Sequence, residues 1–363
     1  EMVIRDWSSD VCSSDLTNNG NNWIAANYGL TATSVRSIVV SGSNIFAGTN
    51  GGVFLSTNSG SSWSAVNNGL TNLDVRSLAM SGSNIFAGTR ADIFLSNNNG
   101  VSWTKVSNGL PTNDPSNYIF SIAISGNNIF AGTSKYGVYL SVNNGSTWTA
   151  INSGLPNIMV RKLEIMGANV FAATSDGVYL SSNQGDNWTL VNNGMADTNI
   201  YALEVVGSNL FVGTPNGVYI SIDNGSKWER MNEGFLFDGL PVYEFIIDGD
   251  YLYAGTGAGV WRRKLSDFNV LDVSTTSIGL NATNNTATFN IISNVSWSVS
   301  SSASWLAVSS ASGSGNSTIT LTAGEATVPR TAVVTVSSEG MPDRVITVSQ
   351  DGIGEWKSVN EGL

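Results

Sequence analysis

Tryptophan recurs along most of this chain at a nearly constant interval. Six tryptophans are separated by 40, 40, 45, 40 and 40 positions. A repeat of about 40 residues that contains several short apolar runs is typical of the four-stranded blades of a β-propeller. The repeat therefore predicts an all-β domain made of successive blades. The six residues are Trp23, Trp63, Trp103, Trp148, Trp188 and Trp228.

Each repeat contains four strand-like segments, which are divided by Gly, Asn and Ser. In the first complete copy they cover 35–42, 44–49, 52–58 and 63–70. Their continuous apolar runs are typical of strands buried on both faces between neighbouring blades. The second segment ends in Gly-Thr or Ala-Thr six times, at Thr49, Thr89, Thr133, Thr174, Thr214 and Thr256.

The two ends of the repeat region complement each other. The region begins with a fourth strand at 23–27 and ends with a third strand at 260–264. Pairing of these segments would close a six-bladed ring and remove its exposed edges. We therefore expect a six-bladed propeller over 17–266, or one of seven or eight blades if preceding sequence contributes more.

The turn before five of the six repeated tryptophans follows the pattern S-x-N-x-G-x-x-W, in which one copy has Asp in place of Asn. The copy before Trp23 has Leu16 where Ser belongs. Asn or Asp bonds the turn backbone, Gly takes a positive φ, and Trp fills the space between sheets. The pattern resembles the Asp-box, or BNR, repeat of sialidase-like propellers, and we assign it a structural role. Calcium binding is a weaker alternative because neutral Asn is a poor ligand for a hard cation. The residues are Ser56, Asn58, Gly60, Trp63, Ser96, Asn98, Gly100, Trp103, Ser141, Asn143, Gly145, Trp148, Ser181, Asn183, Gly185, Trp188, Ser221, Asp223, Gly225 and Trp228.

The composition argues against several classes of function. The chain has a net charge of −11 and a pI near 4.4, so it lacks the basic footprint that nucleic acid requires. It contains no His, which is the commonest general base and metal ligand. No apolar run reaches the ~18 residues of a membrane span. We predict no cofactor and no metal site.

The first sixteen residues are unrelated to the repeat. The stretch DWSSDVCSSDL resembles one reading frame of a common sequencing-library adapter. We expect residues 1–16 to be foreign to the protein, disordered and packed against nothing, with Trp7 and Cys12 outside any core. On this interpretation a signal peptide would not be visible, and we expect a protein that is secreted or on the surface of a bacterium.

Residues 267–352 have a different pattern, in which Ser and Thr alternate with apolar residues. This alternation predicts the strands of a β-sandwich. Trp297, the Trp305-Leu306 pair, the turn at 313–315, Arg330 and Gln350 resemble the BACON domain, a carbohydrate-binding module with an immunoglobulin-like fold. Residues 353–363 again resemble a fourth strand of the repeat. They begin a second propeller, which we favour, or they show that the sandwich is inserted into a blade of the first.

The length differences between repeats all fall in loops on one face of the predicted propeller. Insertions confined to one face are typical of a binding surface. The candidate ligand-binding residues are Arg90, Asp92, Asp114, Tyr118, Phe120, Lys135 and Tyr136 on this face and Tyr201 and Tyr243 at the mouth of the channel. Asn113, Phe235, Phe237 and Asp238 lie on the same loops.

In each repeat one residue follows the first apolar residue of the first strand. Together these residues are expected to form a ring at the channel mouth: Arg36, Arg76, Phe120, Arg161, Tyr201 and Tyr243. Sialidases clamp a carboxylate with three arginines. Here the three arginines occupy one equivalent position of the repeat and no acid, tyrosine and base set accompanies them, so an arginine clamp is the weaker interpretation. A glycosidase needs two carboxylates beside the scissile bond. Among Asp74, Asp92, Asp114, Asp197, Asp238 and Glu244 no spacing identifies a pair.

These patterns predict a non-catalytic binding or scaffold protein that recognises polysaccharide or glycoprotein glycans. The alternatives are a glycoside hydrolase of sialidase-like or xyloglucanase-like type and a purely structural spacer or adhesin. The oligomeric state is not indicated by the sequence. Aromatic rings combined with a few polar groups commonly hold sugars, so the loops at 90–92, 111–120 and 134–137 are expected to form one contiguous patch.

Overall fold

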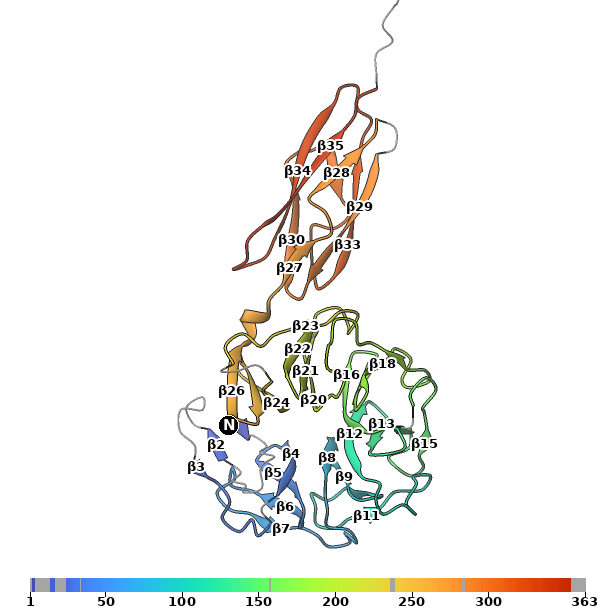
Figure 1. The fold of residues 1–363 in the computed structure, drawn as a ribbon, viewed down its shortest axis with the longest axis vertical. Helices are drawn as coiled ribbons and strands as arrows, with labels where there is room; N and C mark the ends of the chain where they lie inside the picture. The colour runs from blue at the N-terminus through green and yellow to red at the C-terminus, as the bar shows by residue number, and fades with distance from the viewer. Residues whose placement is uncertain are drawn as a thin grey trace, which may run out of the picture. The chain divides into compact units, whose positions relative to one another are not determined.

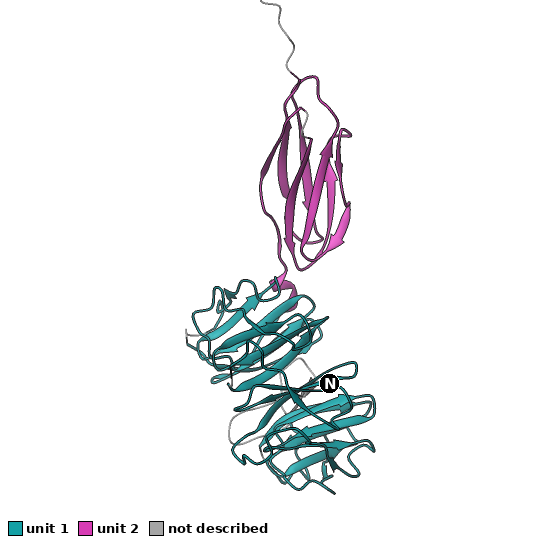
Figure 2. Ribbon diagram, turned by 90° about the vertical axis from the view of Figure 1, so that its right-hand side faces the viewer, with its two compact units in different colours: residues 1–264 teal, residues 265–363 magenta. Residues whose placement is uncertain are grey.

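The computed structural model describes residues 2–3, 14–16, 24–32, 34–156, 158–235, 239–282 and 285–353. Clustering of contacts divides the chain into two compact units, residues 1–264 and 265–363 (Figure 2). Almost every regular element is a strand, and one 3-10 helix, η1 (Leu265–Phe268), begins the second unit. The fold is therefore all-β, and the boundary lies close to the one expected after residue 266.

The first unit is a β-propeller whose blades surround a central channel (Figure 1). Five blades are four-stranded antiparallel sheets in which the first strand lies innermost. Their strands are β4 (Val35–Ser41), β5 (Asn44–Thr49), β6 (Gly52–Ser56) and β7 (Ser64–Ala65); β8 (Ser77–Ser81), β9 (Asn84–Gly88), β10 (Ile93–Ser96) and β11 (Thr104–Lys105); β12 (Ile119–Ser125), β13 (Asn128–Thr133), β14 (Val138–Ser141) and β15 (Thr149–Ala150); β16 (Val160–Met166), β17 (Asn169–Thr174), β18 (Gly177–Ser181) and β19 (Thr189–Leu190); and β20 (Ala202–Val206), β21 (Asn209–Thr214), β22 (Gly217–Ser221) and β23 (Glu229–Arg230).

A sixth blade contains three strands, β24 (Val242–Asp248), β25 (Tyr251–Thr256) and β26 (Gly259–Lys264). The expected closing pair between 23–27 and 260–264 is wrong for the described residues. There β26 pairs only with β25, and the segment after Trp23 pairs elsewhere.

That segment, β3 (Ile24–Ala25), pairs with β2 (Ser14–Leu16), which in turn pairs with β1 (Met2–Val3). The expectation that residues 1–16 pack against nothing is therefore wrong for these two strands. Pairing with a strand that is near in sequence costs less loop entropy than pairing with one at the far end of the propeller. Trp7 and Cys12 lie outside the described residues.

The core is divided among the interfaces between blades. In the first of these, Phe46 and Val53 of one blade pack with Val75, Phe94 and Trp103 of the next. All five are buried, and each middle strand is covered on both faces. This burial explains why these strands are continuous apolar runs rather than alternating ones.

The repeated turn before each Trp is a closed hydrogen-bond network. In the first complete blade the Ser56 hydroxyl donates to Asn58 Oδ1 at 3.0 Å and accepts from Gly60 N at 2.9 Å. Gly60 has a φ of +83°, which disfavours any residue with a side chain. Trp63 donates its indole N–H to Ala26 O of the preceding segment at 2.7 Å. The next four repeats form the same bond at 2.7 or 2.8 Å.

A β-bulge near the start of the innermost strand sets which side chains face the channel. In four blades the pairing register shifts by one residue, so that Arg36, Phe120, Arg161 and Tyr243 are each inserted. A bulge re-aims the inserted side chain and bends its strand. As a result, two successive residues of one strand line the same cavity, as Arg161 and the residue after it do.

The second unit is a sandwich of two sheets, in the orders β27-β29-β33-β31 and β28-β35-β34-β30-β32. Trp297 is 4% exposed and donates its indole N–H to Gly315 O at 2.8 Å, so it belongs to the core. Trp305 is half-buried, and the Arg330 guanidinium lies 4.2 Å from its ring centroid. The strands are β27 (Leu271–Val273), β28 (Ser277–Leu280), β29 (Thr286–Ser293), β30 (Ser296–Ser301), β31 (Leu306–Val308), β32 (Ser312–Ser314), β33 (Ser317–Ala323), β34 (Arg330–Ser337) and β35 (Arg344–Gln350).

Removal of one turn hydroxyl tests the role of the repeated turn. The buried Ser141 bonds Asn143 and Gly145, so we expect Ser141→Ala to lower the free energy of unfolding by about 1–3 kcal/mol. Chemical denaturation measures this change. The exposed Ser146 of the same turn is the matched control, and Ser146→Ala should change stability by no more than about 0.5 kcal/mol. Equal effects of the two substitutions would contradict the assigned role.

Candidate functional site

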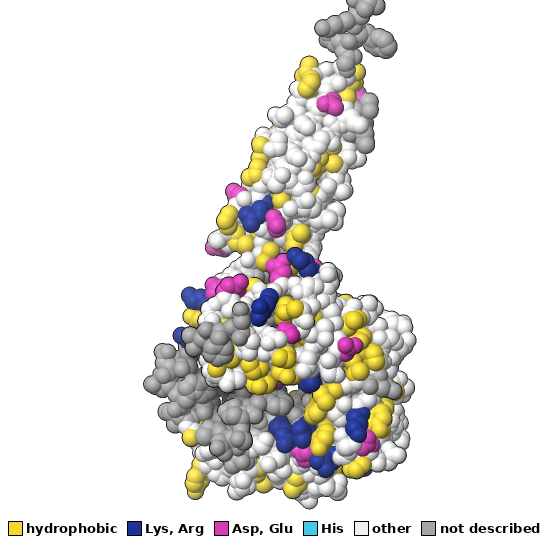
Figure 3. Space-filling model, in the orientation of Figure 1, with side chains coloured by type: hydrophobic (Ala, Val, Ile, Leu, Met, Phe, Trp, Pro, Cys, Tyr) yellow, Lys and Arg dark blue, Asp and Glu magenta, His cyan; other side chains and the backbone are white. Residues whose placement is uncertain are grey.

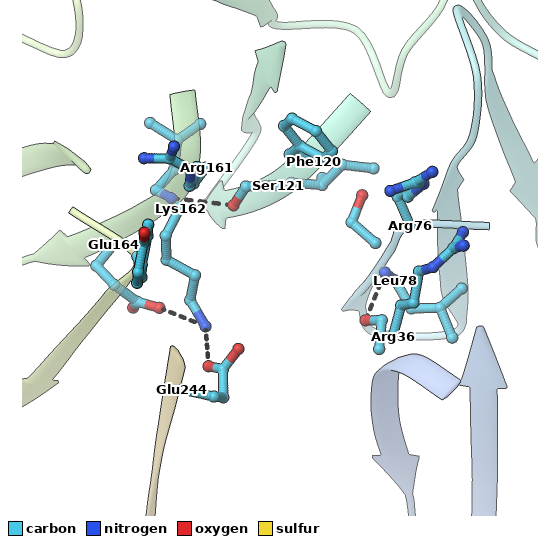
Figure 4. Close-up of a pocket in the computed structure, with 14 residues that line it drawn as sticks. Arg36, Arg76, Leu78, Phe120, Ser121, Arg161, Lys162, Glu164 and Glu244 are labelled. Carbon is cyan, nitrogen blue, oxygen red and sulfur yellow. Dashed lines mark hydrogen bonds and ion pairs between the residues drawn. The ribbon is translucent and has the colours of Figure 1, made fainter. Parts of the chain in front are cut away.

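The centre of the propeller contains a cavity of about 350 Å³. Its walls come from the innermost strands, and basic side chains gather beside the hollow at the centre of the propeller (Figures 3 and 4). The lining residues are Arg36, Ser37, Arg76, Ser77, Leu78, Phe120, Ser121, Ile122, Arg161, Lys162, Leu163, Glu164, Tyr201 and Glu244.

The serines of this lining join neighbouring blades. Ser37 Oγ accepts a hydrogen bond from Leu78 N at 2.8 Å, and Ser121 Oγ accepts one from Leu163 N at 3.0 Å. In the fourth and sixth blades Lys162 and Glu244 occupy the position that serine has in the first three. In these two blades a charged side chain therefore lines the channel in place of the serine that bonds the next blade.

Two guanidinium groups of the lining hold a carboxylate that lies outside the lining. Asp74 Oδ1 accepts a short hydrogen bond from Arg36 Nη1, and Asp74 Oδ2 lies 3.2 Å from Arg76 Nη2. Burial alone would raise the pKa of Asp74, but the hydrogen bonds from Arg36 and Arg76 outweigh it and hold the pKa below its ordinary value. Both arginines are thus engaged by this carboxylate.

Arg76 also belongs to a stack that leads from the channel to the rim. Its guanidinium lies 4.2 Å from the ring centroid of Tyr118 and 5.8 Å from that of Phe120. The two rings are parallel to within 6°. Arg90 lies 5.0 Å from the Tyr118 centroid and donates to the Tyr118 hydroxyl at 2.6 Å. The Tyr118 ring is therefore already in contact with two cations and a second ring.

The opposite wall combines Arg161 with two stacked tyrosines. Arg161 Nη1 donates to Asn199 Oδ1 at 2.8 Å and to Ile200 O at 2.7 Å. Its guanidinium lies 5.2 Å from the centroid of Tyr201, which stacks on Tyr243 at 5.5 Å. Burial lowers the pKa of Arg161 from its ordinary value.

Deeper in the channel an ammonium group lies between two carboxylates. Lys162 Nζ is 3.0 Å from Glu244 Oε1 and 3.5 Å from Glu164 Oε1 (Figure 4). Sequence reasoning named Glu244 as an acid but missed Lys162 and Glu164. The sequence signal for Lys162 was that it stands where the first three blades have serine.

The rim loops of the third blade form a second polar network. Asp114 Oδ2 accepts from Lys135 Nζ and from the Tyr136 hydroxyl, each at 3.0 Å. Hydrogen bonds from Ser116 and then Lys135 lower the pKa of Asp114 well below its usual range. The hydrogen bond to Asp114 raises the pKa of Tyr136.

The structure brings together most of the residues expected on the variable face. Ala91 N donates to Asn117 O and Ser134 N donates to Tyr118 O, so the three loops form one contiguous patch as expected. Asp92 is an exception, because it pairs with Lys105 of the outermost strand at 2.7 Å. Phe235 contacts Trp261 instead, with ring centroids 5.4 Å apart, and Phe237 and Asp238 lie outside the described residues.

The described residues contain neither a membrane-spanning helix nor a cluster of metal-ligating side chains. No helix among them is long and apolar enough to cross a membrane. Nowhere in this part of the chain do three or more His, Cys, Asp or Glu side chains gather as a group that could hold a metal ion.

Two family models match the chain. Residues 2–129 and 121–248 match the model described as the DUF6242 beta propeller domain, and residues 270–353 match the Viral BACON domain. The propeller and the BACON resemblance expected from the sequence are both confirmed. No curated protein matches this chain.

Solved structures with the same propeller fold include two at low sequence identity. An ancestral GH74 enzyme is 20% identical with a TM-score of 0.51, and the match covers 71% of this chain and 43% of that one. YCF48 bound to D1 peptide is 14% identical with a TM-score of 0.56, and the match covers 70% and 87%. These likenesses concern the fold alone.

A shorter match is to a Bacteroides ovatus GH5 xyloglucanase in complex with a XXXG heptasaccharide. It is 31% identical with a TM-score of 0.23 and covers 23% of this chain and 19% of that one. This chain therefore spans less than half of the GH74 enzyme and about a fifth of the xyloglucanase.

The wall around Asp74 gives a prediction about stability. Asp74→Asn leaves Arg36 and Arg76 without their shared carboxylate, so the free energy of unfolding near pH 7 should fall by about 1 kcal/mol after solvent screening. The pKa of Asp74 is lowered by folding, so its contribution is complete above the ordinary value near 3.8 and is lost as the pH falls through the folded value.

Denaturation of the wild type and the Asp74→Asn variant over a range of pH measures this contribution. Their difference should be constant above about pH 4 and shrink below it. The exposed Asp186 supplies the control variant Asp186→Asn, for which we expect a change within about 0.5 kcal/mol. A difference that persists unchanged into strong acid would contradict this assignment.

Proposed function

This chain belongs to the family of DUF6242 β-propeller domains, and from this premise we propose that it is a non-catalytic protein that binds glycans outside the cell. The BACON match of its second unit fits a carbohydrate-related extracellular protein. We propose that it is secreted by a bacterium or attached to its surface and that its partners are polysaccharide or glycoprotein glycans.

The observation that carries the proposal is the contiguous patch on the propeller rim. We define the rim surface as Arg90, Asp114, Tyr118, Lys135 and Tyr136. Its polar groups are held in fixed positions by one another, at 2.6 Å between Arg90 and the Tyr118 hydroxyl and at 3.0 Å between Asp114 and Tyr136. A preorganised set of donors and acceptors beside aromatic rings suits hydroxyl-rich ligands, because little ordering is needed on binding.

The two tyrosines of the rim surface take different roles in the proposal. Tyr118 contacts Arg76, Arg90 and Phe120, so its ring supports the surface rather than offering a face to a sugar. Tyr136 is fixed through its hydroxyl by Asp114 and lies next to the exposed Lys135. We therefore assign the stacking contact to Tyr136.

A glycoside hydrolase is the alternative, because the channel contains two carboxylates. Such an enzyme needs one carboxyl group that donates a proton and a second that stays ionised. The ammonium of Lys162 lies within 3.5 Å of both Glu164 and Glu244, so both carboxylates already contact the same cation. This arrangement favours binding over hydrolysis. A spacer without any ligand is the remaining alternative.

Glycan binding by the full chain tests the proposal. A glycan array identifies a ligand, and calorimetry then compares the wild type with Tyr136→Ala. If the Tyr136 ring stacks on a sugar, its loss should weaken binding about tenfold. Tyr28, which is 80% exposed and precedes the first complete blade, is the matched control, and Tyr28→Ala should leave affinity unchanged.

Three outcomes would count against the proposal. Release of reducing sugar from the bound glycan would favour the hydrolase. Binding to no glycan would favour the spacer. Unchanged affinity in both Tyr118→Ala and Tyr136→Ala, with the fold intact by circular dichroism, would exclude the rim surface as the binding site.

A further inference from the structure

Arg161 differs from the other basic side chains of the channel. Its two bonds from Nη1 go to neutral oxygens, of Asn199 and of the Ile200 backbone. Among the described residues it forms no ion pair with a carboxylate. A half-buried guanidinium of this kind keeps its charge in an environment that does not neutralise it.

The other cations of the cavity are already matched by carboxylates. Arg36 and Arg76 share Asp74, while Lys162 lies between Glu164 and Glu244. Four of the 16 basic residues of this acidic chain line the cavity, so the channel is a local exception to the net charge of −11. Arg161 is the member of this set whose anion is missing.

The geometry of Arg161 defines the group that would fit. Both hydrogens of Nη1 are used, so the edge formed by Nε and Nη2 carries the remaining N–H groups. Two parallel N–H groups on a guanidinium edge match the two oxygens of a carboxylate. The Tyr201 ring centroid lies 5.2 Å from the guanidinium and the ring stacks on Tyr243, which provides flat apolar surface near the charge.

We propose that the channel cavity binds the carboxylate of an acidic sugar, which pairs with Arg161 between Tyr201 and the opposite wall. This inference rests on the proposed glycan binding and specifies its ligand as an acidic polysaccharide. The cavity of about 350 Å³ is at the lower end of small-ligand sites, which suits a single sugar unit.

One stack of side chains links the wall of the cavity to the rim surface. Phe120 and Arg76 line the cavity, Arg76 covers the Tyr118 ring, and Tyr118 bonds Arg90 on the rim. On this proposal one sugar unit occupies the channel while neighbouring units of the same chain lie across the rim surface. Arg161 supplies the selectivity for a carboxylate, because Lys135 of the rim is already paired with Asp114.

The test uses one oligosaccharide in two charge states. Trigalacturonate and its fully methyl-esterified form share a backbone and differ in the carboxylate. By calorimetry, the full chain should bind the acid about tenfold or more tightly than the ester, as expected for a charge-assisted pair. Arg161→Gln should remove this preference and leave the affinity for the ester unchanged. Arg161→Lys should keep part of it, because the charge remains but the paired N–H edge is lost.

Arg230→Gln is the matched control, since Arg230 lies on the outermost strand β23 and is exposed. The Arg230→Gln variant should prefer the acid over the ester to the same degree as the wild type. A sulfated galacto-oligosaccharide forms a further arm. If it binds better than trigalacturonate and depends equally on Arg161, the anion is a sulfate ester and the carboxylate assignment is overturned.

The failure of this inference is distinguishable from that of the proposed function. Equal binding of acid and ester, with both weakened by Tyr136→Ala, would overturn the inference and leave glycan binding intact. A preference for the acid that survives in Arg161→Gln would also overturn it. Failure of trigalacturonate to bind, while neutral glycans of the array do bind, would have the same meaning. Binding to no glycan at all would overturn both.

Discussion

The interface between blades depends on one hydrogen bond that recurs from repeat to repeat. The indole N–H of each tryptophan donates to a carbonyl of the preceding repeat, from Trp63 to Trp228. The same ring is nearly fully buried, so a single side chain supplies both apolar contact and a directed bond. Since each blade is held to its neighbour in this way, the repeated turn that orients the tryptophan controls the position of the whole sheet. The channel then follows from the placement of the sheets.

Within this frame the β-bulge of the innermost strand determines what the channel contains. At three of the four bulges the inserted residue and its successor both line the cavity, as Arg36 and Ser37 do. Where the residue after the bulge is serine, its hydroxyl bonds the next blade. Where that residue is lysine or glutamate, a charged side chain lines the channel instead. Packing between blades and the chemistry of the site are thus set by adjacent residues of one strand.

Much of this architecture could be predicted from sequence because it is periodic. The spacing of Trp63, Trp103 and Trp148 determines the blades, and the confinement of insertions to one face locates the rim surface. The alternation in the last third of the chain likewise identifies the sandwich. In each case a local pattern is repeated often enough for one physical explanation to account for every copy.

The features that sequence did not predict are those that depend on contacts between repeats. Asp92 was expected on the rim, but it pairs with Lys105 of the adjacent outermost strand. Tyr118 was expected to offer its ring, but Arg76 of the preceding blade covers it. Closure was expected from complementary ends, yet Ile24–Ala25 pairs with a nearer strand. The spacing of residues within the repeat predicts the face on which each side chain lies, but it does not predict which neighbouring side chain or strand it contacts.

The bulge has a consequence for how such a protein can change over time. It fixes the direction in which a side chain points but leaves the residue type open, since arginine, phenylalanine and tyrosine all occupy the inserted position. The buried tryptophans and turn serines that hold the blades together are other residues, on other strands. A substitution at the inserted position therefore changes the lining of the cavity without removing any of these tryptophans or turn serines. The residue type at this one position can vary while the repeated contacts between blades stay the same.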